Sequence, residues 1–275
     1  MKGLSLPIRP FRRTAQVGVA LLFAVVPVLN RMGITTLSGN FLFFDIAGIP
    51  LADPLSVLQV AVGAFSVTPT MCAGAGLALL LALFKGPVFC SWLCPYGLFS
   101  ELAHAFGGKR ARGTNFSRRA SLASKPFIVC VGLLAVCFFA PVPLLNQLSM
   151  PGWYSRAMQH AVFYREALAC ALIFPALLVA EFLAGRRFWC LYLCPQSVLI
   201  SLAGAMLPGR LRVRFSGKRC TCAKSERPCR EHCSLGLDPR SAGFTQHLQC
   251  SNCGDCVDAC RKNGRALRFS FGRDV

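Results

Sequence analysis

Four closely spaced cysteines, in the pattern C-x2-C-x2-C-x3-C, are the residues of this sequence best suited to chemistry. They are Cys250, Cys253, Cys256 and Cys260. This spacing is typical of [4Fe-4S] ligation, in which the first three thiolates hold one cubane and the fourth ligates the other cluster of a two-cluster protein. The pattern therefore predicts an electron carrier, with a second group of ligands elsewhere in the chain.

A second group of four cysteines precedes this run, and it consists of Cys220, Cys222, Cys229 and Cys233. Together the two groups supply eight thiols, the number that two [4Fe-4S] clusters need. With crossed fourth ligands, Cys233 would join the first three cysteines of the later run, and Cys260 would join the other three of the earlier group. Structural zinc, which prefers paired C-x2-C knuckles, and disulfides are the alternatives. The spacing favours iron-sulfur clusters over both.

A third cysteine pattern, C-x3-C-P, occurs twice, 100 residues apart. Its cysteines are Cys90 and Cys94 in CSWLCP, and Cys190 and Cys194 in CLYLCP. On a helix, residues i and i+4 share a face, so the thiols of each pair can point together and two pairs would make a four-thiol site. Three interpretations stay open: a shared metal or cluster site that would form a third redox centre, a redox dithiol, or plain helix-end thiols. The repetition favours a redox or metal role.

The composition places most of the chain in a membrane. Hydrophobic residues make up 54% of the 275 residues and charged residues only 15%, which is too apolar for two soluble domains. The net charge of +19 comes from basic residues between and after apolar blocks, so a membrane explains it better than a nucleic-acid partner does. Because no C-x-x-C-H motif occurs and the four histidines cannot pair between helices, we expect no haem.

Four apolar stretches are long enough to cross a membrane as helices. They cover residues 14–30, 70–89, 126–148 and 161–185. Prolines and glycines interrupt residues 31–69, where we expect an interfacial or re-entrant loop. Basic residues concentrate before the first stretch, between the second and third, and after the fourth, so the positive-inside rule places both termini in the cytoplasm.

These elements predict an all-α membrane protein in which four transmembrane helices form two repeated hairpins, each ending in a C-x3-C-P motif, within residues 1–207. The polar and basic residues 208–275 would form a small C-terminal α+β ferredoxin-like domain in the cytoplasm. Two acids of the fourth stretch, Glu166 and Glu181, are candidates for taking protons from a quinol. Ion pairs with neighbouring arginines explain these acids equally well.

The whole pattern resembles the membrane ferredoxin-type proteins of the NapH and MauN kind, which belong to periplasmic nitrate reduction and methylamine utilisation. The resemblance is carried by the CSWLCP and CLYLCP motifs, four predicted spans, a basic middle linker and a cysteine-rich C-terminal part. Two features depart from the family. The earlier group has the spacing C-x-C-x6-C-x3-C, and its last cysteine, Cys233, is followed by Ser234, where the family often has a regular run that ends in Cys-Pro. In addition, Cys260 is followed by Arg261. These departures imply unusual ligation of the first cluster.

The resemblance implies quinol oxidation in the bacterial inner membrane. Electrons would come from the quinone pool and would pass through a companion ferredoxin-type or cytochrome redox protein to a periplasmic system, of the nitrate reductase or methylamine utilisation type. Two roles stay open. The chain could be a quinol dehydrogenase subunit, or an accessory electron donor for the assembly or maturation of a partner metalloenzyme.

Overall fold

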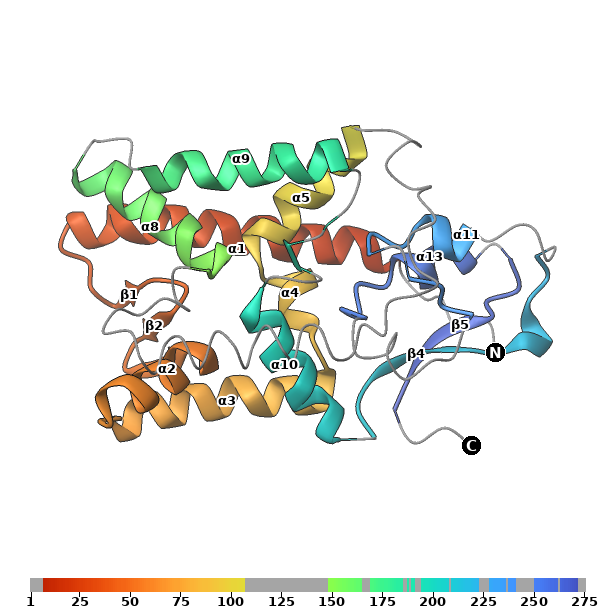
Figure 1. Cartoon of the computed structure of the whole chain (residues 1–275), viewed down its shortest axis with the longest axis horizontal. Helices are drawn as coiled ribbons and strands as arrows, with labels where there is room; N and C mark the ends of the chain where they lie inside the picture. The colour runs from red at the N-terminus through yellow and green to blue at the C-terminus, as the bar shows by residue number, and fades with distance from the viewer. Residues whose placement is uncertain are drawn as a thin grey trace.

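A computed structural model describes most of this protein (Figure 1). It describes residues 7–106, 148–164, 169–184, 187, 189–190, 194–207, 209–222, 228–235, 237–240, 250–261 and 263–271. Helices occupy one end of the elongated molecule, and the cysteine-rich C-terminal part lies at the other end with the N-terminus of the first helix. The contacts between these two parts position the candidate site.

The first helix, α1 (Ile8–Arg31), runs along the helical part and reaches the cysteine-rich part. Its buried face changes character along its length, because it carries Arg12 and Gln16 near the start and Ala20, Phe23 and Val26 further on. These positions recur every three or four residues, which places them on one side of a helix. The polar start of this face contacts the cysteine-rich part, and its apolar continuation packs against α8 (Met150–Phe163).

An antiparallel three-stranded meander follows α1, where a loop was expected. It consists of β1 (Leu37–Gly39), β2 (Phe43–Ile46) and β3 (Ile49–Ala52), in the order β1-β2-β3. The two-residue turn between β2 and β3 has positive φ at Ala47 and Gly48, which suits a tight hairpin. The residues expected to form an irregular loop therefore form paired strands, and their place at a membrane interface stays a prediction.

Short helices then bring the first C-x3-C-P motif into place. They are α2 (Pro54–Ala64), α3 (Pro69–Lys85), α4 (Val88–Trp92) and α5 (Pro95–Phe106). Helix α3 packs closely on β3, because at Gly74 a Cβ atom would lie only 2.8 Å from the Pro50 carbonyl oxygen. Gly86 and Pro87 separate α3 from α4; Gly86 has a φ of +71°, and proline cannot donate a backbone hydrogen bond.

The second part of the chain contributes α8, α9 (Ala169–Ala184) and α10 (Pro195–Met206). Helix α9 packs against α5 and α8, and α10 packs against α3. The cysteine-rich part contains β4 (Arg212–Phe215), a 3-10 turn at Gly217–Arg219, α11 (Pro228–Glu231), α13 (Asp255–Cys260) and β5 (Leu267–Ser270). Strands β4 and β5 form an antiparallel pair. The predicted domain boundary at residues 207/208 falls between α10 and β4 and stays a prediction.

The prediction of an all-α protein with four transmembrane helices in two hairpins is wrong. Among the described residues, α1 is the single helix that is long and apolar enough to cross a membrane, and two small sheets are present. Helix α3 has 17 residues, about 26 Å of helix, because Gly86 and Pro87 end it. The expected span over 161–185 is divided between α8 and α9, and the expected span over 126–148 lies almost entirely outside the described residues.

Candidate iron-sulfur centres

The loop that carries the C-x2-C-x2-C cysteines turns sharply. Asn252 and Gly254 both have positive φ, of 51° and 85°, and Gly254 directly precedes α13. At Gly254 a Cβ atom would lie 2.9 Å from the side chain of Ile8, so glycine also permits the close approach of α1. The turn brings the thiols of Cys250, Cys253 and Cys256 to one side of the loop.

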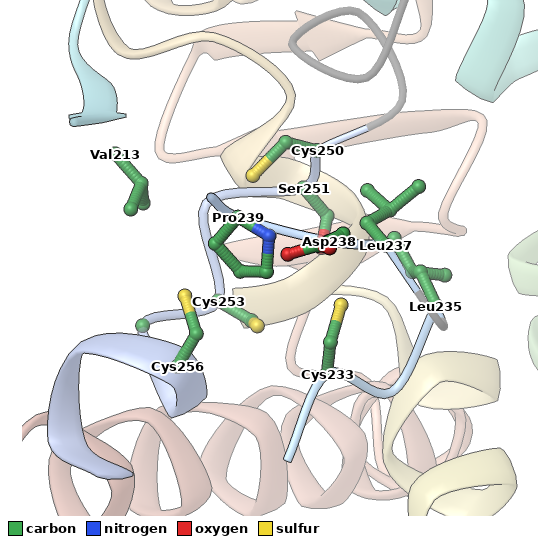
Figure 2. Close-up of a pocket in the computed structure, with 11 residues that line it drawn as sticks. Val213, Cys233, Leu235, Leu237, Asp238, Pro239, Cys250, Ser251, Cys253 and Cys256 are labelled. Carbon is green, nitrogen blue, oxygen red and sulfur yellow. The ribbon is translucent and has the colours of Figure 1, made fainter. Parts of the chain in front are cut away.

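These three thiols line a cavity together with Cys233, which comes from a separate segment (Figure 2). Figure 2 shows the four sulfurs around one space, with Val213, Leu235, Leu237 and Pro239 supplying apolar walls. The sequence predicted this grouping of Cys233 with the later run. The structure brings the four residues together, and their role as ligands stays a prediction.

The other four C-terminal cysteines form a second group. Cys229 and Cys260 lie in a small buried core with Ala266 and Leu267, and Cys220 packs against it. Cys222 interacts electrostatically with Cys220 and Cys260. Cys256 contacts this core as well, so the two groups adjoin each other.

The thiols of the first group are buried, which affects their protonation. Burial raises the pKa of Cys233 to about 11, and it raises the pKa values of Cys253 and Cys256 as well, so these thiols are protonated until a metal replaces the proton. Among the described residues, no three histidine, cysteine or acidic side chains gather closely enough to hold a single metal ion.

The two C-x3-C-P motifs have the same local backbone geometry. The Cys94 amide donates to the Phe89 carbonyl over 3.0 Å, and the Cys194 amide donates to the Trp189 carbonyl over 2.9 Å. In each motif the proline then begins a new helix, α5 or α10. Cys90 and Cys94 therefore do not lie on one continuous helix face, as the i and i+4 spacing suggested, because α4 ends at Trp92.

Cys94 and Cys190 belong to one packed cluster of side chains. Cys90 lies within electrostatic range of Cys94, Cys190 and Cys194, so the four thiols of the two motifs are neighbours. Cys94 and Cys194 are buried. Burial raises the pKa of Cys94 to about 12, and Arg187 opposes this effect without overcoming it. The Arg187 guanidinium lies 3.7 Å from the Cys190 sulfur. The structure thus assembles four thiols and one cation; whether they hold a redox centre stays a prediction.

Two buried acids adjoin this four-thiol group. Glu181 accepts hydrogen bonds from the Ser100 hydroxyl (2.7 Å) and the Trp189 amide (2.9 Å). Glu101 pairs with three arginines and was not among the predicted site residues. Its isolation in the sequence could have indicated a special role, because Glu101 is the only acidic residue between Asp53 and Glu166. Glu166 itself lies outside the described residues.

Hydrogen bonds from side chains to backbone carbonyls join the first C-x3-C-P motif to the cysteine loop. The Ser91 hydroxyl donates to the Ser251 carbonyl over 2.6 Å, and the Trp92 indole donates to the Asn252 carbonyl over 3.4 Å. The Asn252 side chain in turn donates to the Lys85 and Leu211 carbonyls. The middle residues of CSWLCP therefore hold the loop that carries the C-x2-C-x2-C cysteines.

Comparison with known proteins gives independent information about these segments. The family model described as a 4Fe-4S binding domain matches residues 67–113 and 167–214, and each match contains one C-x3-C-P motif. The "Methylamine utilization ferredoxin-type protein MauN" of Methylobacillus flagellatus is 29% identical over 95% of this chain and 90% of its own length. The "Ferredoxin-type protein NapH" of Escherichia coli is 27% identical over 84% of this chain and 79% of its own length.

A further relative is the "Putative electron transport protein YccM" of Escherichia coli, 29% identical over 66% of this chain and 51% of its own length. No solved structure matches the chain. The resemblance to the NapH and MauN kind is confirmed, because the similarity covers most of the chain and its motif segments match a 4Fe-4S binding model. The chain is thus a homologue of the ferredoxin-type proteins MauN and NapH, and two of its segments match a 4Fe-4S binding domain model.

Proposed function

We propose that this protein is a membrane-bound electron-transfer protein that takes electrons from quinol and holds two [4Fe-4S] clusters in its C-terminal part. One observation carries the proposal: Cys233, Cys250, Cys253 and Cys256 converge on one cavity although they come from two separate segments. When bound, a [4Fe-4S] cluster accepts and releases one electron at a time. A quinol releases two electrons and two protons, so two adjacent clusters match its two electrons.

The second group of thiols supports a second cluster with crossed ligands. Cys260 belongs to α13, the helix that also carries Cys256, but it lies with Cys229 and Cys220. The direct contact of Cys256 with that core keeps the two groups adjacent. Short separation between the groups favours transfer of electrons from one to the other.

The C-x3-C-P thiols are the candidates for a third centre between the quinol and the C-terminal clusters. Four thiols from two repeats approach one another there, and Arg187 supplies a positive charge that offsets thiolates. The residues that join this place to the cysteine loop, Ser91 and Trp92, keep the two regions in contact.

Attachment to the bacterial inner membrane would use α1. This helix exposes apolar side chains such as Val17, Leu21 and Val25 on the face opposite its buried residues. Such a surface favours lipid over water. The cysteine-rich part would then lie on the cytoplasmic side, and a companion ferredoxin-type or cytochrome redox protein would receive the electrons; no nucleic acid is involved in this proposal.

The first experiment measures iron, sulfide and the electron paramagnetic resonance (EPR) signal after anaerobic reconstitution. The wild type should bind iron and sulfide and show the signal of reduced [4Fe-4S] clusters. Cys253→Ser should lose about half of the iron of the C-terminal part, because one of two clusters loses a ligand. Cys72→Ser is the matched control, since Cys72 is exposed and outside all three cysteine groups. Zinc without iron, or unchanged iron in Cys253→Ser, would overturn this ligation.

The second experiment separates quinol oxidation from an accessory role in the assembly of a partner enzyme. A quinol is added to reconstituted protein in lipid vesicles, and reduction of the clusters is followed by the loss of their visible absorbance. Rapid reduction supports quinol oxidation. Clusters that stay oxidised with quinol, but are reduced by dithionite, would favour the accessory role.

A further inference from the structure

A buried row of alternating charges connects the two cysteine regions. Arg187 lies 3.4 Å from Glu101, Glu101 lies 2.6 Å from Arg12, and both carboxylate oxygens of Asp255 lie 2.9 Å from Arg12. The exposed fractions of these side chains are 3%, 4%, 0% and 14% in that order. Charges this deeply buried are screened little by solvent, so each acts strongly on its neighbours.

One end of this row reaches both cysteine regions, and the other end reaches the C-terminal region. At one end, Arg187 contacts the Cys190 sulfur at 3.7 Å and the hydroxyl of Ser234, the neighbour of Cys233, at 3.3 Å. At the other end, Asp255 lies between Cys253 and Cys256 in the chain, and Arg12 interacts electrostatically with Cys253. Glu101 is therefore the central anion between Arg187, which contacts both regions, and Arg12, which lies beside the C-terminal region.

The row is built from four distant parts of the sequence. Arg12 belongs to α1, Glu101 to α5 and Asp255 to α13, and Arg187 follows α9. The position of Arg12 is fixed further by the Ser91 carbonyl, which accepts a hydrogen bond from it at 3.5 Å and another from Gln16 at 2.7 Å. Breaking a buried pair of this kind leaves an uncompensated charge, so the row persists as a unit.

We propose that Glu101 is a positioning residue that sets the reduction potential of the cluster at Cys233, Cys250, Cys253 and Cys256 by holding Arg12 and Arg187 between the two cysteine regions. The inference rests on the proposed function, because it concerns a cluster at those thiols. Reduction adds one negative charge to the cluster. Any residue that makes its surroundings more positive therefore favours the reduced form and raises the potential, and any that makes them more negative lowers it.

The test is a redox titration of the reconstituted protein, followed by the EPR signal of the reduced cluster. Glu101→Gln removes the central anion and should raise the midpoint potential, whereas Arg12→Gln removes a cation and should lower it. A unit charge at short range inside a protein changes an equilibrium constant on the order of tenfold, which is about 59 mV for one electron. The double variant Arg12→Gln/Glu101→Gln restores the net charge, and its potential should return toward that of the wild type.

Arg31→Gln is the matched control, because it removes the same charge from the opposite end of α1, where Arg31 contacts the Val162 carbonyl. Its potential should equal that of the wild type.

Shifts of opposite sign in the two single variants cannot arise from a general loosening of the site. If the midpoint potentials of the two single variants shift in the same direction, or do not shift, in protein that retains iron, the role of Glu101 is overturned and the proposed function is not affected. Should both single variants lose iron, the charge-neutral double variant decides: a wild-type potential supports the inference, and any shift beyond the control overturns it. Absence of an iron-sulfur signal in the wild type would overturn the proposed function itself, and this inference with it.

Discussion

The two cysteine regions differ in how they are assembled. In the C-terminal cavity, Cys250, Cys253 and Cys256 come from one tight loop and Cys233 is added from a neighbouring segment. In the C-x3-C-P region, the four thiols come from two motifs 100 residues apart, and packing of helices brings them together. The first region is mainly a product of local chain geometry, and the second is a product of the tertiary fold.

The two regions also differ in the polarity of the residues around the thiols. The C-terminal cavity has mostly apolar walls, and its loop is held through backbone carbonyls by Ser91 and Trp92. The C-x3-C-P thiols lie beside the buried charges of Arg187 and Glu181. A loop can hold its ligands without much help, whereas thiols on separate helices depend on every contact that fixes those helices. The two regions should therefore respond differently to mutation.

The largest expected effect is on electron transfer through the C-x3-C-P region. Cys90→Ala and Cys190→Ala should each slow quinol-dependent reduction of the C-terminal clusters by at least about tenfold, since loss of a residue that only hydrogen-bonds to a metal ligand already costs that much at metal sites. The double variant should be no slower than either single variant, because residues of one site act as a unit. The iron content of the C-terminal part should not change. Near-wild-type rates in all three would show that these thiols only pack.

The second-largest expected effect is a loss of stability when the buried ion pairs of Arg12 are removed. Arg12→Ala should lower the free energy of unfolding by about 3–5 kcal/mol, because it removes the arginine that lies closest to buried Glu101 and the arginine that pairs with partly buried Asp255. Denaturant unfolding in detergent measures this change. Arg31→Ala provides the comparison at the exposed end of α1 and should change the unfolding free energy by less than about 0.5 kcal/mol. Equal losses in the two variants would contradict the role of the buried pairs.

A pH effect on stability is expected at Asp53, beside the second C-x3-C-P motif. Asp53 is buried and accepts a hydrogen bond from Gln196, which follows the motif proline. Burial raises the pKa of Asp53 from 3.8 to about 6, so the folded state binds this proton more tightly than the unfolded state. The contribution of Asp53 to stability is therefore greatest below about pH 4 and is lost as the pH rises through about 6, a change of roughly 3 kcal/mol at most.

Asp53→Asn tests this pH effect, because the amide oxygen can still accept hydrogen bonds but cannot titrate. The difference in unfolding free energy between variant and wild type, measured from about pH 4 to about pH 7, should change in favour of the variant as the pH rises. A difference that is constant over this range would contradict the proton binding assigned to Asp53.

The smallest expected effect concerns the link between the regions. Ser91→Ala leaves the buried Ser251 carbonyl without its hydrogen bond and should cost about 1–3 kcal/mol. The cysteine loop should then release its iron faster to a chelator than in the wild type. Ser66→Ala, at an exposed serine, should leave both quantities unchanged. If Ser91→Ala releases iron at the wild-type rate, the motif does not hold the loop.

The sequence by itself determined the candidate ligands and the family, because both depend on local patterns. The spacing of Cys250, Cys253 and Cys256 acts within one loop, and the repeated C-x3-C-P motifs match the 4Fe-4S binding model twice. Hydropathy alone misjudged the helical part. It cannot detect that Gly86 and Pro87 end α3, or that residues 37–52 pair as strands, since both outcomes depend on backbone geometry.

Only the tertiary structure decided how distant charges meet. Arg12 looked like the basic flank of an apolar helix, and Glu101 looked like a lone acid in an apolar segment. Folding removes both from water, which is favourable only when each finds an opposite charge. That requirement brings Arg12, Glu101, Arg187 and Asp255 into one buried row, although these residues span most of the chain. The pattern and spacing of residues contain no information about such pairs, because the desolvation free energy that makes pairing necessary arises only when the charged side chains are buried.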